Sequence, residues 1–183
     1  TYRDEIVKRV YVEYQKRLIA SNAVDFDDLL VYTARLLEDN PTVRDKYAQR
    51  FRHVLVDEFQ DTNLAQYALV KHLASHHKNV FCVGDQDQSI YSWRGADWRN
   101  VQRFEQDFPD SQTILLEQNY RSRQNILNAA MGVIDRASNR KRKKLFTDRG
   151  EGEKIFFYEA PDDYTEASFV VDTIAQLVAS RQF

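Results

Sequence analysis

The stretch HVLVDEFQDTN, residues 53–63, runs a short apolar segment directly into two adjacent carboxylates, Asp57 and Glu58. A continuous apolar run is typical of a strand that is covered on both faces of a parallel sheet. Ligands of such sheets bind beyond the carboxyl ends of the strands. The carboxylates are either a strand end that turns into solvent or a metal–nucleotide site. The FQD that follows them favours the site, in which one carboxylate holds Mg²⁺ and its neighbour activates the attacking water.

Three further apolar runs predict buried strands at 79–84, 113–117 and 154–160. The segments between the runs are long enough for crossover helices, and Asp97 and Ser122 are suitable N-caps for two of them. Alternating strands and helices predict an α/β fold with a parallel sheet and right-handed crossovers.

Helical patterns dominate both ends of the chain. Apolar residues recur every four positions over 2–20, Asp25 can cap a second helix, and Asn40-Pro41 begins a third. A last helix carries Ala167, Val170, Val171, Ile174 and Val178. The Gly-rich, charged segment 146–154 predicts a domain boundary before that last helix.

Composition narrows the class of protein. The 183 residues are 43% apolar and 30% charged, with 5 Gly and 3 Pro, which predicts a helix-rich globular chain. The net charge of −2 gives no global basic field, although a local patch is enough for nucleic acid. The single Cys82 fits a reducing compartment, and no apolar run is long enough to span a bilayer. We therefore expect a cytoplasmic protein without a membrane partner.

Polar and aromatic residues follow the second predicted strand, within GDQDQSIYSWRGA at 84–96. Gln88 is placed where an amide can contact a terminal phosphate. Tyr91, Trp93 and Arg94 combine two rings with a cation, which is a suitable platform for single-stranded bases. The alternative is that the rings fill the core, but the polar residues before them and the glycine after them disfavour it. Trp98 falls on an apolar helix face and is predicted to be core.

The third predicted strand ends in EQNYRS, where Tyr120 and Arg121 pair a ring with a guanidinium. A tyrosine can stack on adenine, and an arginine can neutralise charge on a transferred phosphoryl group. The basic run NRKRKK at 139–144 is either a solvated helix end or a phosphate contact.

Three motifs in this order resemble those of superfamily 1A DNA helicases, the UvrD/PcrA/Rep group. They are VLVDEFQDTN (54–63), VGDQDQSIYSWRGAD (83–97) and LLEQNYRS (115–122), and DFDDLL (25–30), ILNAAMGVI (126–134) and the segment 139–155 extend the match. The resemblance implies an ATP-dependent enzyme that moves 3′ to 5′ on single-stranded DNA and unwinds duplex DNA. It also implies a RecA-like P-loop NTPase sheet with flanking helices and an N-terminal helical segment.

The resemblance assigns roles to eight residues. Asp57 and Glu58 become the Walker B magnesium and catalytic pair, Gln88 and Arg121 contact the γ-phosphate, and Tyr120 stacks on adenine. Tyr91 and Trp93 stack on DNA bases, with Arg94 on the same coupling path. The implied domains are 1–21 (end of an inserted helical subdomain), 22–148 (later part of the first motor domain) and 149–183 (start of the second).

The phosphate-binding loop GxxxxGK[ST] of that family is missing from this sequence, since none of the five glycines precedes a lysine. We therefore expect a fragment that does not turn over ATP alone and that self-associates through exposed sheet surface. Two alternatives stay open: a fragment of a helicase–nuclease subunit of the RecB/AddA kind, and a non-catalytic module that binds DNA or a partner protein.

Overall fold

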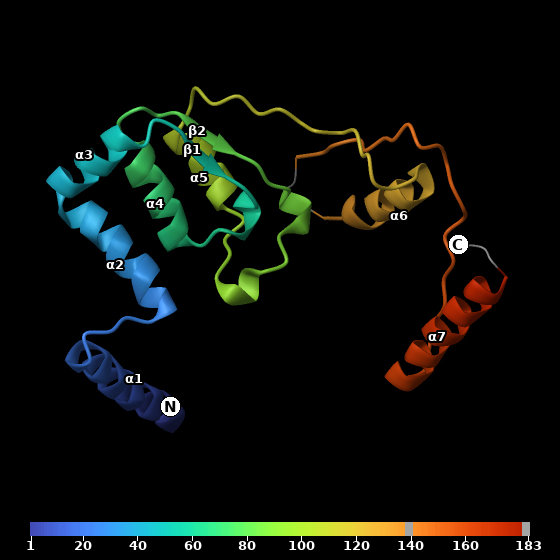
Figure 1. Cartoon of the computed structure of the whole chain (residues 1–183), viewed down its shortest axis with the longest axis horizontal. Coiled ribbons are helices and arrows are strands. Elements are labelled where there is room, and N and C mark those ends of the chain that lie inside the picture. Colours follow the sequence, from blue (N-terminus) through green and yellow to red (C-terminus); the bar gives the residue numbers. More distant parts are fainter. Residues whose placement is uncertain (138–140, 181–183) are drawn as a thin grey trace. The chain divides into compact units, whose positions relative to one another are not determined.

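The computed structural model describes residues 1–137 and 141–180. The chain divides into two compact units, Thr1–Ile114 and Leu115–Phe183. The first unit contains helices α1 to α5 and strands β1 and β2, and the second contains α6 and α7 (Figure 1). The mixture of helices with a small parallel sheet agrees with the predicted α/β class.

Helix α1 (Tyr2–Ala20) confirms the helix predicted over 2–20. Its first turn is stabilised by a capping box, in which the Thr1 side chain accepts a hydrogen bond from the Asp4 amide. No residue of α1 is buried. The helix is thus specified by its own caps and periodicity rather than by packing within this unit.

Helices α2 (Phe26–Asp39) and α3 (Pro41–Arg50) begin where the sequence predicted. Asp25 caps α2 in a second capping box, and proline occupies the first turn of α3, where it loses no hydrogen bond. Both helices pack against α4 (Leu64–Ala74).

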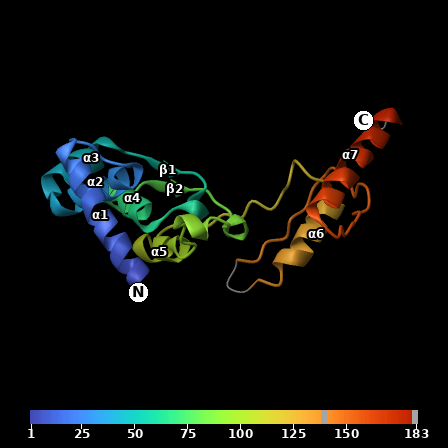
Figure 2. The ribbon, with the colours of Figure 1, turned by 90° about the horizontal axis from the view of Figure 1, so that it is seen from below.

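Strands β1 (Val54–Val56) and β2 (Val80–Cys82) pair in parallel, with Val54 opposite Val80 and Val56 opposite Cys82. Figures 1 and 2 both show the two strands side by side. Because α4 connects them, residues 54–82 form a β-α-β unit, which confirms the first two predicted strands.

Only one face of this two-stranded sheet is covered. Leu55 and Phe81 lie opposite each other in the register and are 73% and 60% exposed. Their neighbours in each strand are half-buried. The prediction that both faces are covered is therefore wrong within this unit, since its helices shield one face alone.

The core of the first unit is built around Phe59, which is 4% exposed and follows β1. The Phe59 ring meets Tyr67 of α4 and Phe104 of α5 (Asn100–Asp107) edge-on, at centroid distances of 6.1 and 5.7 Å. The segment after the carboxylate pair is thereby fixed between two helices.

Two sequence predictions near α5 are wrong. The helix begins at Asn100 with Arg99 as its N-cap residue, so Asp97 does not cap it. The Asp97 carboxylate is instead bound by the side chains of Arg99 and Arg103. Trp98 was predicted to be core but is 40% exposed, because it lies in the turn before α5.

The second unit contains the two helices predicted for it, α6 (Gln124–Ile134) and α7 (Asp163–Ala179). The prediction that Ser122 caps α6 is wrong. Asn119 organises this turn, since its side-chain oxygen accepts hydrogen bonds from the amides of Arg121 and Ser122 at 3.0 and 2.7 Å.

The strands predicted at 113–117 and 154–160 do not form in the described structure. A strand needs a neighbour to satisfy its backbone groups. The first run is followed by one isolated parallel bridge between Gln118 and Phe146. In the second run, the Tyr158 ring stacks on Phe169 of α7 at 3.9 Å, so this run packs through its side chains.

Candidate functional site

The carboxylate pair lies at the carboxyl end of β1, where both side chains are exposed. Asp57 is the first residue after the strand, and its carboxylate accepts a hydrogen bond from the Glu58 amide at 2.9 Å. Glu58 adopts the left-handed backbone conformation, with φ 48° and ψ 43°. This conformation is uncommon for a residue with a side chain and is found often at functional sites.

Gln60 joins the carboxylate pair to the end of β2. It is 2% exposed and lies in the short 3-10 helix η1 (Phe59–Asp61). Its amide nitrogen donates to the Glu58 carboxylate at 2.8 Å, and its side-chain oxygen accepts from the Asp85 amide at 2.9 Å. The site prediction missed this residue, although its place in the motif marked it as a polar group beside the pair.

Gly84 is required by this close approach. A methyl group at Gly84 would lie 2.7 Å from the side-chain oxygen of Gln60 and 3.1 Å from the Phe59 nitrogen. Both are shorter than ordinary van der Waals contacts. Glycine therefore lets the end of β2 lie directly against the residues that follow Glu58.

Gln88 lies in the loop after β2, at the end of the 3-10 helix η2 (Gln86–Gln88). Its side chain is exposed, and its amide nitrogen donates to the Asp85 carboxylate at 2.8 Å. The amide is therefore held on the same loop whose Asp85 backbone is bonded to Gln60.

Tyr91, Trp93 and Arg94 form one cluster around the 3-10 helix η3 (Ser92–Arg94). The ring centroids are 6.3 Å apart, and the Arg94 guanidinium lies 5.3 Å from the Tyr91 ring and 5.7 Å from the Trp93 ring. Trp93 is 78% exposed and Tyr91 is 37% exposed. The rings do not fill the core, so the surface reading of this loop is confirmed.

Tyr120 and Arg121 belong to the second unit. Tyr120 is 75% exposed, its hydroxyl donates to the Gln118 side chain at 2.8 Å, and its carbonyl accepts from Arg149 at 3.2 Å. The Arg121 side chain is exposed as well. These residues form a local cluster at the start of α6.

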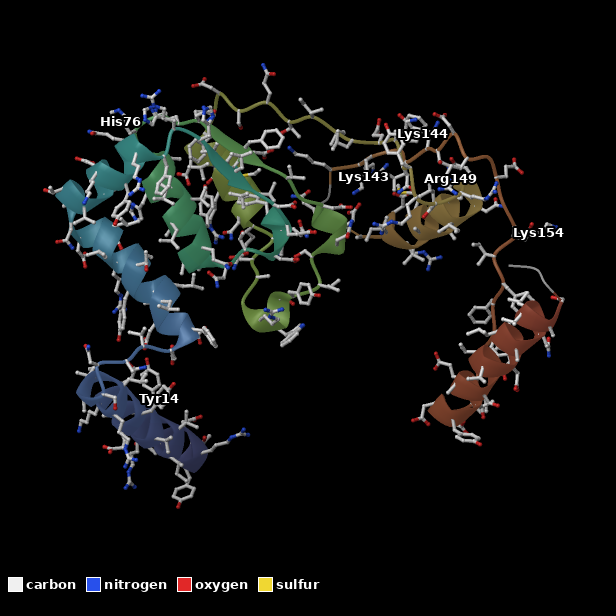
Figure 3. The ribbon with its side chains drawn as sticks, viewed as in Figure 1. Tyr14, His76, Lys143, Lys144, Arg149 and Lys154 are labelled. Carbon is white, nitrogen blue, oxygen red and sulfur yellow. The ribbon has the colours of Figure 1, made fainter. Side chains whose placement is uncertain are left out.

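Basic residues continue along the segment after α6. Figure 3 labels Lys143, Lys144, Arg149 and Lys154 on it. Part of the predicted basic run 139–144 lies outside the described residues. The Arg149 guanidinium donates to the Tyr120 carbonyl at 3.2 Å, so this segment contacts a predicted site residue.

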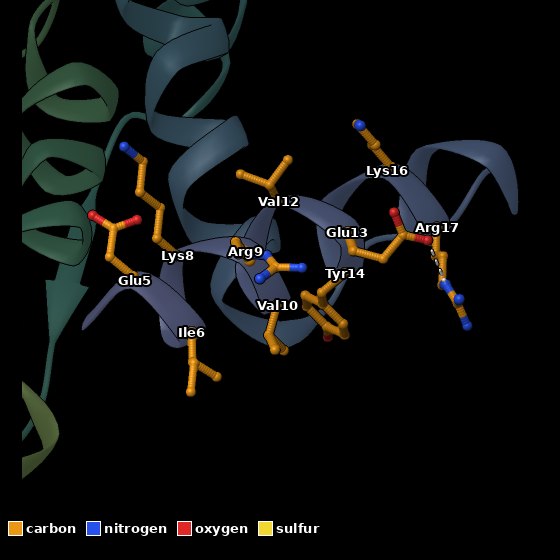
Figure 4. A pocket seen from close by; sticks show the side chains of 10 residues that line it. All are labelled: Glu5, Ile6, Lys8, Arg9, Val10, Val12, Glu13, Tyr14, Lys16 and Arg17. Atoms are coloured by element: carbon orange, nitrogen blue, oxygen red, sulfur yellow. Dashed lines mark hydrogen bonds and ion pairs between the residues drawn. The ribbon is translucent and has the colours of Figure 1, made fainter. Parts of the chain in front are cut away.

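A hollow of about 910 Å³ runs along α1 and is unrelated to the carboxylate pair. All of its lining residues lie between Glu5 and Arg17 of this one helix, and Figure 4 shows them pointing outward around it. The Arg17–Glu13 ion pair closes at 3.0 Å on its surface. A hollow with no second wall cannot enclose a ligand.

The carboxylate pair fits a magnesium ion that arrives with a nucleotide. Within the described residues, no three His, Cys, Asp or Glu side chains gather closely enough to hold a metal by themselves. Mg²⁺ in nucleotide sites takes one or two carboxylates and completes its shell with waters and phosphate oxygens. Two exposed carboxylates at a strand end are such a donor set.

The protonation state of Cys82 limits the chemistry near the end of β2. Burial raises the pKa of the half-buried Cys82 thiol to about 11, so it is not a thiolate nucleophile at neutral pH.

Among the helices of the described chain, none is both long and apolar enough to cross a membrane.

The first unit thus combines a parallel β-α-β unit with an exposed carboxylate pair at the end of one strand and exposed rings after the next. Residues 1–109 match the UvrD/REP helicase N-terminal domain, and residues 114–183 match the UvrD-like helicase C-terminal domain. The chain belongs to the UvrD-like helicase family.

Individual relatives agree with this assignment. The chain is 49% identical to the ATP-dependent DNA helicase PcrA of Bacillus subtilis, 53% identical to the ATP-dependent DNA helicase UvrD1 of Mycobacterium tuberculosis and 52% identical to PcrA of Staphylococcus aureus. These alignments cover 94% to 96% of the chain but 24% of each relative. The chain thus spans about a quarter of the length of these relatives.

Proposed function

We propose that this chain is part of an ATP-dependent DNA helicase of the UvrD/PcrA/Rep type. The intact protein would couple ATP hydrolysis to 3′–5′ movement on single-stranded DNA and to duplex unwinding in the bacterial cytoplasm. The proposal is supported by relatives that are named ATP-dependent DNA helicases and share about half of their aligned residues with the chain. Under this proposal the intact protein would use ATP as its cofactor and Mg²⁺ as its metal, and it would bind single-stranded and duplex DNA.

The fold element we propose is part of a RecA-like motor domain. Its support is the β-α-β unit over 54–82, because nucleotide sites of open parallel sheets lie at the carboxyl ends of the strands. We retain 1–21, 22–148 and 149–183 as the proposed domain segments. The compact units and the two family matches both divide near residue 114, within the second segment.

Asp57 and Glu58 are the proposed hydrolytic pair. Asp57 would hold the magnesium that accompanies ATP, and Glu58 would accept a proton from the attacking water. When bound, the metal supplies charge that stabilises the phosphoryl oxygens. The bond from Gln60 fixes one Glu58 oxygen and leaves the other for water.

The loop after β2 is the proposed link between nucleotide and DNA. Gln88 would contact the γ-phosphate, and Tyr91 and Trp93 would stack on single-stranded bases, with Arg94 orienting both rings. One loop then carries a phosphate sensor and a base platform only a few residues apart.

Tyr120 and Arg121 are the nucleotide contacts that we propose for the second unit. The exposed Tyr120 ring would stack on adenine, and the Arg121 guanidinium would neutralise charge on the γ-phosphate. The turn bonds from Asn119 fix the backbone of Arg121 and so set the direction in which its side chain leaves the chain.

The observation that carries the proposal is the exposed carboxylate pair bonded through Gln60 to the loop that bears the rings. Its test uses Glu58→Gln in the full-length protein. The amide keeps the shape of the carboxylate but cannot act as a base. We expect ATP binding to persist while DNA-stimulated phosphate release falls by about 100-fold or more, the contribution of a general base. Wild-type turnover in this variant would contradict the role of Glu58.

A further inference from the structure

Both ends of the ring-bearing loop, Asp85–Ala96, are attached to the three residues that follow Phe59. At the first end, the Asp85 amide donates to the buried side chain of Gln60, and the Ser89 hydroxyl lies 3.4 Å from the Gln60 carbonyl. The start of the loop is therefore fixed to the turn that also holds Glu58.

The second end of the loop is fixed to Thr62. The Asp97 amide donates to the Thr62 carbonyl at 3.0 Å. Asn100, which is completely buried, donates its side-chain amide to the same carbonyl at 2.9 Å and to the Thr62 hydroxyl at 3.1 Å. A third contact, at 3.3 Å, reaches the carbonyl of Asn63. Buried amides satisfied in this way resist displacement, because breaking the contacts leaves them unpaired.

Two arginines lock this end of the loop from the other side. Arg99 forms a bidentate pair with the Asp97 carboxylate at 2.7 and 3.0 Å. Arg103 donates to Asp97 at 2.9 Å and to the side-chain oxygen of Asn100 at 2.7 Å. We call Thr62, Asp97, Asn100 and Arg103 the loop anchor.

Hydrogen bonds and ring contacts also form within the loop, between its two ends. The Tyr91 carbonyl accepts hydrogen bonds from the amides of Arg94 and Ala96 at 2.9 and 3.2 Å. Arg94 contacts both rings. Because these contacts connect the loop to itself, we expect it to move as one body when residues 60–62, to which both of its ends are bonded, shift.

We propose that Asn100 is a positioning residue that transmits the nucleotide state of the carboxylate pair to the base platform, by tying Thr62 to the end of the loop. The inference rests on the proposed function. In its terms, a change at Glu58 shifts η1 and Thr62, and the loop anchor carries the shift to Tyr91 and Trp93. Asn100 touches neither nucleotide nor DNA in this scheme, so its effect lies in the coupling of the two affinities.

The test measures that coupling in the full-length protein. Affinity for a fluorescent oligothymidylate is measured with and without a non-hydrolysable ATP analogue, and the ratio of the two dissociation constants reports the coupling. Coupled sites typically show ratios of about 5 to 150. In Asn100→Asp, the shape and the Arg103 contact are kept, but an oxygen replaces the donor to Thr62. We expect the ratio to fall toward one, while DNA affinity without nucleotide changes by less than about threefold, well within the range of one lost contact.

A second pair of variants covers the case in which Asn100→Asp fails to fold. Thr62→Val keeps the side-chain shape without the hydroxyl, whereas Thr62→Ser keeps the hydroxyl. We expect the valine variant to lose at least half of the coupling ratio and the serine variant to retain it. A wild-type ratio in both the Asn100→Asp and the Thr62→Val variants would overturn the inference.

The matched control is Tyr67→Phe. It removes the 2.6 Å hydrogen bond from α4 to Asp107 of α5 and leaves the loop anchor intact. We expect lower stability with an unchanged coupling ratio. If Tyr67→Phe reduced the ratio as much as Asn100→Asp, general loosening of α5 would explain the effect and the inference would be overturned. A wild-type protein with no DNA-stimulated ATP hydrolysis would instead contradict the proposed function itself.

Discussion

The Arg94 guanidinium lies 5.7 Å from the Trp93 ring centroid, yet Trp93 keeps 78% of its surface exposed. A cation–π contact orients an aromatic ring without burying it. The energy of the contact offsets part of the cost of holding a large apolar side chain in water. The ring face is thereby presented in a fixed direction, which is what a stacking platform for bases requires.

Trp93→Ala in the full-length protein is expected to weaken single-stranded DNA binding by about tenfold to a hundredfold, because one stacked base is worth roughly 1–3 kcal/mol. Melting should change little, since an exposed ring contributes little to the core. A buried tryptophan would instead cost about 3–5 kcal/mol of stability. Fluorescence anisotropy and calorimetry on the same variant separate the two cases.

Two other variants serve as controls for Trp93. Trp93→Phe keeps a flat ring and should retain most of the affinity. Ile90→Ala removes an apolar side chain of the same loop that is 68% exposed but has no ring, and it should bind DNA normally. Unchanged binding by Trp93→Ala together with a large loss of melting temperature would remove Trp93 from the DNA site.

Gly84→Ala is expected to destabilise the first unit by about 1–3 kcal/mol, the usual cost of overpacking. The added methyl group would meet the side-chain oxygen of Gln60 at 2.7 Å, and that side chain holds both Glu58 and Asp85. ATP hydrolysis by the full-length protein should fall as well. Urea denaturation and phosphate release measure the two effects.

Gly132→Ala is the matched control for that substitution. Gly132 lies inside α6, and an added methyl group would meet nothing within 4 Å. Alanine favours helix by about 1 kcal/mol over glycine, so stability should rise. Equal effects of the two substitutions would show that the contact with Gln60 does not constrain residue 84.

Local signals predicted most of the helices of this chain. Asp25 was predicted to cap α2 and does so within one turn. The capping boxes of Thr1 and Asn63, which the sequence analysis did not name, are equally local signals at the starts of α1 and α4. Strands depend on a neighbour elsewhere in the chain. The strands at 54–56 and 80–82 pair with each other, whereas the runs at 113–117 and 154–160 have no paired strand in the described structure.

The site residues also divide into those that local sequence signals predicted and those whose contacts depend on distant parts of the chain. The residue types at Asp57, Glu58, Trp93 and Arg94 were enough to predict a nucleotide site and a base platform from the sequence, and these roles stay predictions. The roles of Gln60 and Asn100 depend on which backbone atoms come to lie beside them, and no spacing rule gives that. Asp97 was misread as a helix cap for the same reason, because arginines two and six positions later compete for its carboxylate.

This chain alone is expected to release no phosphate from ATP, with or without single-stranded DNA. Its sequence holds no GxxxxGK[ST] loop, whose backbone amides and lysine cradle the phosphates. The assay uses saturating ATP and Mg²⁺, and the full-length protein is the positive control. Turnover by the chain near the ordinary enzyme range of about 1 to 1000 per second would show that its own residues form a complete site.

The ion pairs of Asp97 with Arg99 and Arg103 are expected to make the stability of the first unit depend on pH. The hydrogen bonds from Arg99 and then Arg103 lower the pKa of its carboxyl well below the ordinary value, against the opposing effect of burial. A group with a lowered folded-state pKa stabilises the fold fully above its unfolded pKa, about 3.9 for aspartate. That contribution is lost as the pH falls from there toward the folded-state pKa.

Asp97→Asn is therefore expected to lower the free energy of unfolding most at pH 7 and progressively less below about pH 4, where the wild-type carboxyl begins to lose its advantage. Urea denaturation of the two proteins at pH 7, 5 and 3 measures the gap. Asp45→Asn is the control, because Asp45 is a surface residue 3.8 Å from Arg44 and exposed pairs contribute little. A difference in unfolding free energy that stayed constant from pH 7 to pH 3 would mean that the charge of Asp97 does not stabilise the loop anchor. The hydrogen bond from the Asp97 backbone amide to the Thr62 carbonyl would then hold this end of the loop without that charge.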